Sequence, residues 1–204
     1  SMMPKRLRTP IGIIEPRFDR VGICTDVPAH QLKRALPMDL LEATTHTIKI
    51  EKRKGKRGAR ILLTCLPDML ELEILKEHEH VLGDYRVTYV ELAMDLPAIS
   101  LAVAREKRDW LVSRLEKVRP ARHYLRWVQK RKDDRILSDI ELESRGLVRE
   151  ATVEYEDRRV EHGLVVYIRR QKLAGKKFDS LIVRTEFKSK GSRAVRQRYG
   201  GYQL

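Results

Sequence analysis

The chain has 204 residues, enough for one full domain or for one domain with an extension. Its 43 Lys and Arg residues outnumber its 29 Asp and Glu residues, which gives a formal net charge of +14 and a pI near 10.0. Such an excess of cations favours phosphate contacts and indicates a nucleic-acid-binding protein, whereas the lack of an apolar run of about 18 residues excludes a membrane span.

Cysteine usage and the N-terminal segment favour a cytoplasmic protein. Cys24 and Cys65 are too few for a disulfide framework, and each sits in an apolar run that is typical of buried free thiols. The first residues, SMMPKRLRTP, lack the apolar segment of a signal peptide. Cytoplasm is therefore the expected location.

The first part of the chain predicts an irregular arm followed by a strand and a helix. Three prolines within residues 1–18 argue against a regular element there. Arg20 to Val27 reads as a short strand, and Pro28 opens a helix in its first turn.

A β-hairpin with a basic tip is predicted next. Residues 44–53 alternate with a period of two, as a half-buried strand does, and residues 59–66 form a more continuously apolar second strand. The turn between them, residues 54–58, has the sequence KGKRG.

The following helix and strand complete a recognisable order. A helix after Pro67 ends at Gly83, which is a typical C-cap residue, and residues 86–96 form a strand. The order strand, helix, strand, strand, helix, strand predicts an α+β, ferredoxin-like (split βαβ) fold, an antiparallel sheet with helices on one face. The segments RVGICTDVPA (20–29) and RVTYVELAMDLPA (86–98) resemble each other, and this topology makes their strands neighbours.

The rest of the chain extends this core. A long helix is predicted from Pro97 to about Val118, with an apolar stripe that includes Ile99, so residues 19–118 form the expected core domain. Residues 119–150 read as a charged connection, part helix and part exposed. Residues 151–204 are expected to complete the same domain with three strands, over 151–155, 164–170 and 180–188, and a basic tail that begins a helix.

Carboxylates on predicted strands are the best candidates for chemistry. Glu91 and Asp95 share one strand face with Ala93, and Glu186 shares a face with Arg184 on a later strand. Carboxylate oxygens suit Mg²⁺ or Mn²⁺. The alternative is a solvated strand face. Asp26 either adds a carboxylate beside Asp95 or introduces the helix after Pro28.

Two segments carry a family resemblance. Residues 58–97 (GARILLTCLPDMLELEILKEHEHVLGDYRVTYVELAMDLP) contain a strand that ends near a proline, a helix, and a strand that ends in VELAMD, of the form hydrophobe-(D/E)-hydrophobe-A-hydrophobe-D. Residues 165–187 (VVYIRRQKLAGKKFDSLIVRTEF) place a tyrosine-containing basic strand before a strand that reads R-x-E. Together they resemble rolling-circle replication initiators of the Rep superfamily and related relaxase-like proteins.

The resemblance implies a site-specific DNA endonuclease. A tyrosine attacks a phosphodiester and becomes linked to the 5′ phosphate, while a divalent metal polarises the phosphate. By position, Glu91 and Glu186 are the implied ligands, with Asp95 either a ligand or the support of one. Tyr167, on a strand, and Tyr199, in the basic tail, are the alternative nucleophiles, and Tyr202 lies in the same tail as Tyr199.

The implied partners are single-stranded or hairpin origin DNA and a replication helicase. The expected DNA contacts fall in the hairpin and in a second basic group, at Lys52, Arg53, Lys54, Lys56, Arg57, Arg60, Arg169, Arg170, Lys172, Lys176 and Lys177.

One departure from the resemblance favours a carboxylate-metal branch or a relative without catalysis. Many relatives use a His-hydrophobe-His metal motif, whereas His78-Glu79-His80 has a charged middle residue and falls in a predicted helix. His46 is a lone strand histidine. The alternative function is therefore a non-catalytic DNA-binding protein of the same fold. A third is an RNA-binding module, although the strands lack the paired aromatics on which bases stack.

Overall fold

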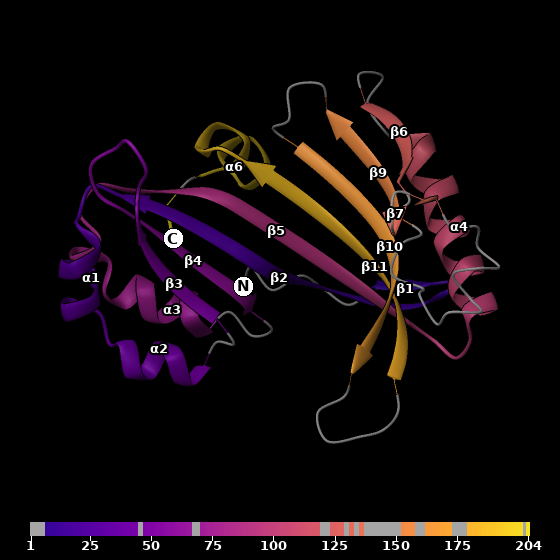
Figure 1. The fold of residues 1–204 in the computed structure, drawn as a ribbon, viewed down its shortest axis with the longest axis horizontal. Helices are drawn as coiled ribbons and strands as arrows, with labels where there is room; N and C mark the ends of the chain where they lie inside the picture. Colours follow the sequence, from indigo (N-terminus) through magenta and orange to yellow (C-terminus); the bar gives the residue numbers. More distant parts are fainter. Residues whose placement is uncertain are drawn as a thin grey trace. The chain divides into compact units, whose positions relative to one another are not determined.

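Figure 1 shows the computed structural model of the chain, which describes residues 7–44, 47–66, 70–118, 123–128, 131–132, 135–136, 152–157, 162–172, 179–201 and 203–204. The chain divides into two compact units: Ser1–Pro16 with Ala93–Phe187 (unit 1), and Arg17–Leu92 with Lys188–Leu204 (unit 2). Three long strands contribute residues to both units: β2 (Gly12–Thr25), β5 (Tyr85–Ala98) and β11 (Asp179–Lys190).

Unit 2 has the ferredoxin-like plan. Its strands follow the order β3 (Thr47–Lys52), β4 (Ala59–Leu66), β2 and β5, and β4 is antiparallel to both of its neighbours. The connection from β2 to β3 holds α1 (Ala29–Ala35) and α2 (Met38–Thr44), and that from β4 to β5 holds α3 (Leu70–Glu77) and the 3-10 turn η1 (Glu79–Val81). The predicted fold class and the neighbouring places of β2 and β5 are thus confirmed.

The core of unit 2 lies between its sheet and α1–α3 (Figure 1). Alternation puts the side chains of Ile23 and Ile61, which are register partners in β2 and β4, on the same face, where both are fully buried. Leu32 of α1 and Leu75 of α3 pack into the same cluster. The opposite face of these strands carries polar side chains, among them the exposed Arg60.

Unit 1 continues with the strand order β5, β11, β10 (His162–Lys172), β9 (Thr152–Asp157) and β6 (His123–Val128), and β9 is antiparallel to both neighbours. β1 (Leu7–Thr9) pairs with the start of β2, and β7 (Arg131–Lys132) pairs with β8 (Arg135–Ile136). Helix α4 (Leu101–Val118) packs on β10, where Ala104, Leu111 and Val112 meet Val166 and Ile168. The predicted tail helix is α6 (Ser192–Tyr199), which belongs to unit 2.

The N-terminal arm, expected to be irregular, is mostly strand over its described residues, 7–18. β1 and β2 are joined by a turn at Pro10, and β2 already begins at Gly12. Pro16 lies within β2, between the residues that pair with β1, which end at Ile14, and those that pair with β4, which begin at Phe18. Proline has no N–H, so within sheets it is found at strand edges and irregular positions rather than inside a regular ladder.

Two further expectations need correction. Part of the charged connection was expected to be helical, but residues 123–128 form strand β6, which pairs with β9. The long helix begins at Leu101 rather than Pro97, and Ile99 is 95% exposed instead of contributing to the apolar stripe. Among the described helices, none combines the length and the apolar character that crossing a bilayer requires.

Candidate active site

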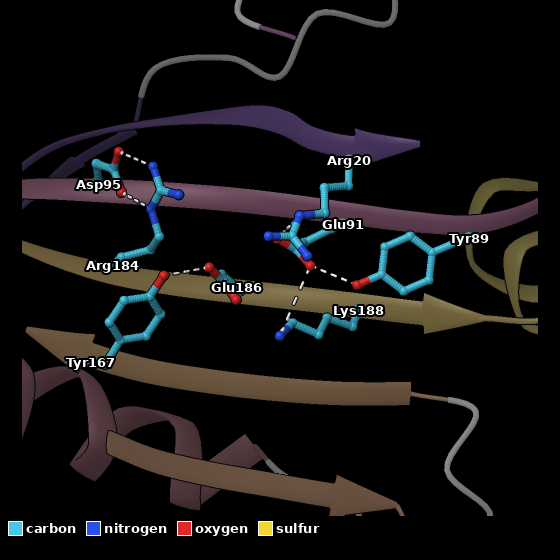
Figure 2. Close-up of polar contacts among 8 residues, drawn as sticks. All are labelled: Arg20, Tyr89, Glu91, Asp95, Tyr167, Arg184, Glu186 and Lys188. Atoms are coloured by element: carbon cyan, nitrogen blue, oxygen red, sulfur yellow. Dashed lines mark hydrogen bonds and ion pairs between the residues drawn. The ribbon is translucent and has the colours of Figure 1, made fainter. Parts of the chain in front are cut away.

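Glu91 is a buried carboxylate with a tyrosine and two cations around it in unit 2. Its side chain is 1% exposed, and the hydroxyl of Tyr89 donates a hydrogen bond to its Oε2 across 2.6 Å (Figure 2). Arg20 Nε lies 3.9 Å from Oε1, and Lys188 Nζ lies 3.9 Å from Oε2. These positive charges offset the cost of burying the carboxylate.

Asp19 on β2 is a second buried carboxylate in unit 2, with an exposed fraction of 6%. One carboxylate oxygen of Asp19 lies within 4.8 Å of one from Glu91. Two acidic groups at this distance repel each other unless a cation compensates them. Their oxygen atoms are of the type that Mg²⁺ and Mn²⁺ prefer.

The sequence analysis missed Asp19 because it ended the irregular arm at residue 18 and began the strand at Arg20. The alternation of this segment nevertheless indicates that Asp19 belongs to the strand. Asp19, Val21 and Ile23 occupy every second position, and all three are buried. An acid that takes one place in an otherwise apolar series indicates a functional or paired carboxylate.

Unit 1 holds a second tyrosine–carboxylate pair. The hydroxyl of Tyr167 on β10 donates a hydrogen bond to Glu186 Oε1 on β11 across 2.6 Å, and Glu186 is buried (Figure 2). Burial, the hydrogen bond to Glu186 and the negative charge of Glu186 raise the pKa of Tyr167, in that order, whereas the charges of Arg184 and Arg169 act against the rise. The phenol is therefore neutral at ordinary pH, with a proton acceptor already in contact.

Asp95 makes its contact with Arg184. Arg184 Nε donates to Asp95 Oδ1 across 2.7 Å, and the second guanidinium bond, to Oδ2, measures 2.9 Å. This is a bidentate ion pair between β5 and β11 within unit 1 (Figure 2). A cation bound by the same carboxylate would compete with the guanidinium for its oxygens.

Strand β11 carries the partners of three candidate residues at regular intervals. Arg184, Glu186 and Lys188 are two residues apart, so they share one face of the strand. They contact Asp95, Tyr167 and Glu91, respectively. The R-x-E pattern quoted from the sequence thus extends to R-x-E-x-K.

Tyr199, the alternative nucleophile, packs as a core residue of unit 2. Its ring centroid lies 6.2 Å from that of Phe18, at an interplanar angle of 57°. Its hydroxyl is buried and has no hydrogen-bond partner among the described residues, and burial raises the pKa of the phenol. Tyr202 and His46 lie outside the described residues.

The basic hairpin tip is built as the sequence predicts. The side chains of Lys52, Lys54, Lys56, Arg57 and Arg60 are exposed, and that of Arg53 is half-buried. Gly55 and Gly58 both have positive φ, of 64° and 90°. A Cβ on Gly58 would lie 2.0 Å from the carbonyl oxygen of Thr25, so only glycine allows this close approach.

The second basic group is described only in part. Arg169 is half-buried, and its buried Nε has no hydrogen-bond partner among the described residues. The side chains of Arg170 and Lys172, and all of Lys176 and Lys177, lie outside the described part of the chain.

Two other candidates have local structural contacts. Asp26 is exposed and accepts the backbone N–H of Asp84 at 3.2 Å, so it does not cap α1, whose N-cap residue is Pro28. His78 hydrogen-bonds through Nδ1 to the carbonyl of Ile74, and its ring stacks on that of His80.

Comparisons with known proteins add a likeness in structure. No protein-family model matches the sequence, and no curated protein matches it significantly. Among solved structures, the chain is similar to a rolling-circle replication initiator protein from Geobacillus stearothermophilus, at 10% sequence identity and a TM-score of 0.45. The match covers 91% of this chain and 78% of the other.

Proposed function

We propose that this chain is a replication-initiator-like DNA-binding protein that nicks one DNA strand by attack of Tyr167 on a phosphodiester. Glu91 and Asp19 of unit 2 are the proposed ligands of a divalent cation, Mg²⁺ or Mn²⁺, and Glu186 of unit 1, which the sequence also assigned as a ligand, is the proposed proton acceptor of Tyr167. The sequence assigned Asp95 to the same site, and in this proposal it acts through Arg184. Single-stranded or hairpin origin DNA is the proposed substrate, and a replication helicase is the proposed recipient of the nicked strand.

The observation that carries the proposal is the hydrogen bond from Tyr167 to Glu186. The buried carboxylate accepts the phenol proton while the Tyr167 oxygen forms its bond to phosphorus. The bond from phosphorus to the 3′-oxygen of the neighbouring nucleotide breaks, and this oxygen leaves with the electron pair. The 5′ phosphate remains on the tyrosine, so the energy of the phosphodiester is kept for a later strand closure.

The residues fit a divalent cation by their chemistry. Asp19 and Glu91 are buried acids of unit 2 that offer only oxygen ligands. Such a cation supplies positive charge for the phosphate in the transition state.

The DNA contact is assigned to the cations of the hairpin tip and of β10. Five of the six hairpin cations are exposed, and two glycines let the chain turn sharply between them. A narrow basic ribbon of this kind suits phosphate contacts along a nucleic-acid backbone. Arg169, whose charge acts on Tyr167, is suited to contact the scissile phosphate.

The test is a nicking assay with supercoiled plasmid and with single-stranded oligonucleotides, in Mn²⁺ or in EDTA. We expect metal-dependent nicking and a covalent adduct, detected by mass spectrometry, that is lost in Tyr167→Phe and retained in Tyr199→Phe. If Tyr167→Phe still forms the adduct, Tyr167 is not the nucleophile.

A non-catalytic DNA-binding protein is the second candidate, and the raised pKa values of Tyr167 and Tyr199 favour it because they oppose phenoxide formation. Tight, salt-sensitive DNA binding without cleavage in any metal would select this function. Tighter binding to RNA of the same length, again without DNA nicking, would select an RNA-binding role.

A further inference from the structure

Asp95 and Arg184 form a partly buried, bidentate ion pair that the nicking chemistry does not use directly. The two bonds measure 2.7 Å and 2.9 Å, and the side chains are 18% and 4% exposed, respectively. Removing either partner leaves the other charge buried without its main counter-charge. A role of Asp95 as a metal ligand would impose this cost on Arg184.

The pair lies beside the proposed catalytic contact in unit 1. β11 is flanked by β5 on one side and by β10 on the other. Arg184 reaches across to Asp95 on β5, while Glu186, two residues further on the same face, receives Tyr167 from β10. Residues 184–186 of β11 thereby form side-chain hydrogen bonds to both neighbouring strands, β5 and β10.

The planar guanidinium of Arg184 restricts how β11 can lie against β5. A planar fork that donates to both oxygens of one carboxylate fixes direction as well as distance. The side chain of Arg184 can hold this geometry only while β5 and β11 keep their register. The position of Glu186, and with it the 2.6 Å contact to Tyr167, follows from the same register.

We propose that Asp95 and Arg184 are positioning residues, whose ion pair holds β11 so that Glu186 presents Oε1 to the hydroxyl of Tyr167. This inference rests on the nicking function proposed above and replaces the metal-ligand role that the sequence assigned to Asp95. Arg184 also contributes its charge near the phenol.

The experiment compares Asp95→Asn, Arg184→Gln, the double variant and Arg184→Lys in the full chain. The control is Val166→Ala, which removes methyl groups from the hydrophobic core of unit 1. Three quantities are measured: the ¹³Cζ NMR signal of Tyr167, assigned with Tyr167→Phe; Mn²⁺ affinity by calorimetry; and kcat and KM for an oligonucleotide.

We expect both single variants to shift the Tyr167 signal and to lower kcat roughly 10- to 100-fold, with little change in KM. The double variant should be no worse than the poorer single variant, because the two residues act as a unit. Arg184→Lys keeps the charge without the fork, so it should fall between the wild type and Arg184→Gln. Val166→Ala should leave the Tyr167 signal in place.

Two results would overturn the inference. If Asp95→Asn weakens Mn²⁺ binding more than about tenfold while Arg184→Gln does not, Asp95 is a metal ligand. If the Tyr167 signal stays in place in both single variants, or moves equally in Val166→Ala, the pair does not position the site. A wild-type chain without nicking activity refutes the proposed function alone, since the Tyr167 signal still reports on the pair.

Discussion

Tyr167 and Glu186 face each other across neighbouring strands, with the phenol oxygen 2.6 Å from the carboxylate oxygen. The contact has two opposed effects. The carboxylate raises the pKa of the phenol, which disfavours free phenoxide, yet it stands where a base must be to take the proton as the oxygen attacks. Under the proposed function, the phenol becomes reactive only when a phosphate and a cation change the charge around it.

The hydrogen bonding of Tyr199 and Tyr167 predicts opposite effects on stability when each is replaced with phenylalanine. Tyr199→Phe removes a buried hydroxyl that has no hydrogen-bond partner among the described residues. Because an unsatisfied buried polar group costs about 1–3 kcal/mol, the free energy of unfolding should be unchanged or higher. Urea denaturation measures this, and Tyr167→Phe, which breaks a hydrogen bond, is the matched comparison. A Tyr199→Phe protein that unfolds more easily would show that the hydroxyl is satisfied in solution.

The carboxylates predict a specific pattern of metal binding. Asp19→Asn and Glu91→Gln should each weaken Mn²⁺ binding about 10-fold or more, measured by calorimetry. Glu51→Gln, at an exposed position on β3, is the control and should leave the affinity unchanged. Equal affinities in all three variants would remove the metal site.

Metal binding should also raise the free energy of unfolding, and this can be measured whether or not the protein has nicking activity. A cation that binds only the folded chain stabilises it by about 2.7 kcal/mol at a concentration of 100 times Kd. Thermal unfolding in Mn²⁺ and in EDTA should therefore differ for the wild type and much less for Glu91→Gln.

The sequence was sufficient for the plan of the fold because the signals were periodic and local. Alternation in residues 44–53 and the apolar run of residues 59–66 predicted the hairpin, and the order of elements predicted that β2 and β5 are neighbours. The start of β2 was hidden because Pro16 reads as a breaker, although it lies between two pairing segments of one strand. Asp19 was not identified as a candidate, because the strand was taken to begin at Arg20 and its alternation was not followed toward the N-terminus.

Contacts between strands were less predictable than the strands themselves. The sequence placed Asp95 and Glu186 on strand faces but could not give the lateral register, which brings Asp95 to Arg184 and Glu186 to Tyr167. The partnership of Tyr89 and Glu91 was accessible, because residues two apart on a strand share a face. Register depends on packing over the whole sheet, which no local pattern encodes.

The hairpin tip predicts the salt dependence of DNA binding. Replacing Lys54, Lys56 and Arg57 with Gln should lower affinity and flatten the plot of log K against log salt by up to about 2–3 units of slope. Lys33→Gln with Arg34→Gln, which removes two exposed cations from α1, serves as the control for net charge. An unchanged slope in the hairpin variant would place the DNA elsewhere.

Tyr85 predicts a loss of stability at alkaline pH. Burial, followed by the hydrogen bond that it donates to Glu79, raises the pKa of Tyr85 to about 12. A raised folded-state pKa means that the contribution to stability is complete below the unfolded value of about 10 and is lost as pH rises toward 12. The free energy of unfolding should fall over this window less steeply in Tyr85→Phe than in the wild type. Parallel curves for the two proteins would show that Tyr85 titrates normally.

The two hairpin glycines provide a matched test of how the basic tip is held. Both have positive φ, so alanine at either costs about 1–2 kcal/mol of backbone strain. At Gly55 the added Cβ meets nothing within 4 Å, whereas at Gly58 it would lie 2.0 Å from the carbonyl oxygen of Thr25 and 2.7 Å from Asp26 Cα. Both of these neighbours are backbone atoms, which cannot rotate away as the end of a side chain can.

Gly58→Ala should therefore destabilise the protein by at least about 2 kcal/mol more than Gly55→Ala in urea denaturation. It should also weaken DNA binding below the unfolding transition, because the hairpin must shift away from β2 to admit the methyl group. Equal stabilities of the two variants would mean that the hairpin base is not pressed against Thr25 in solution.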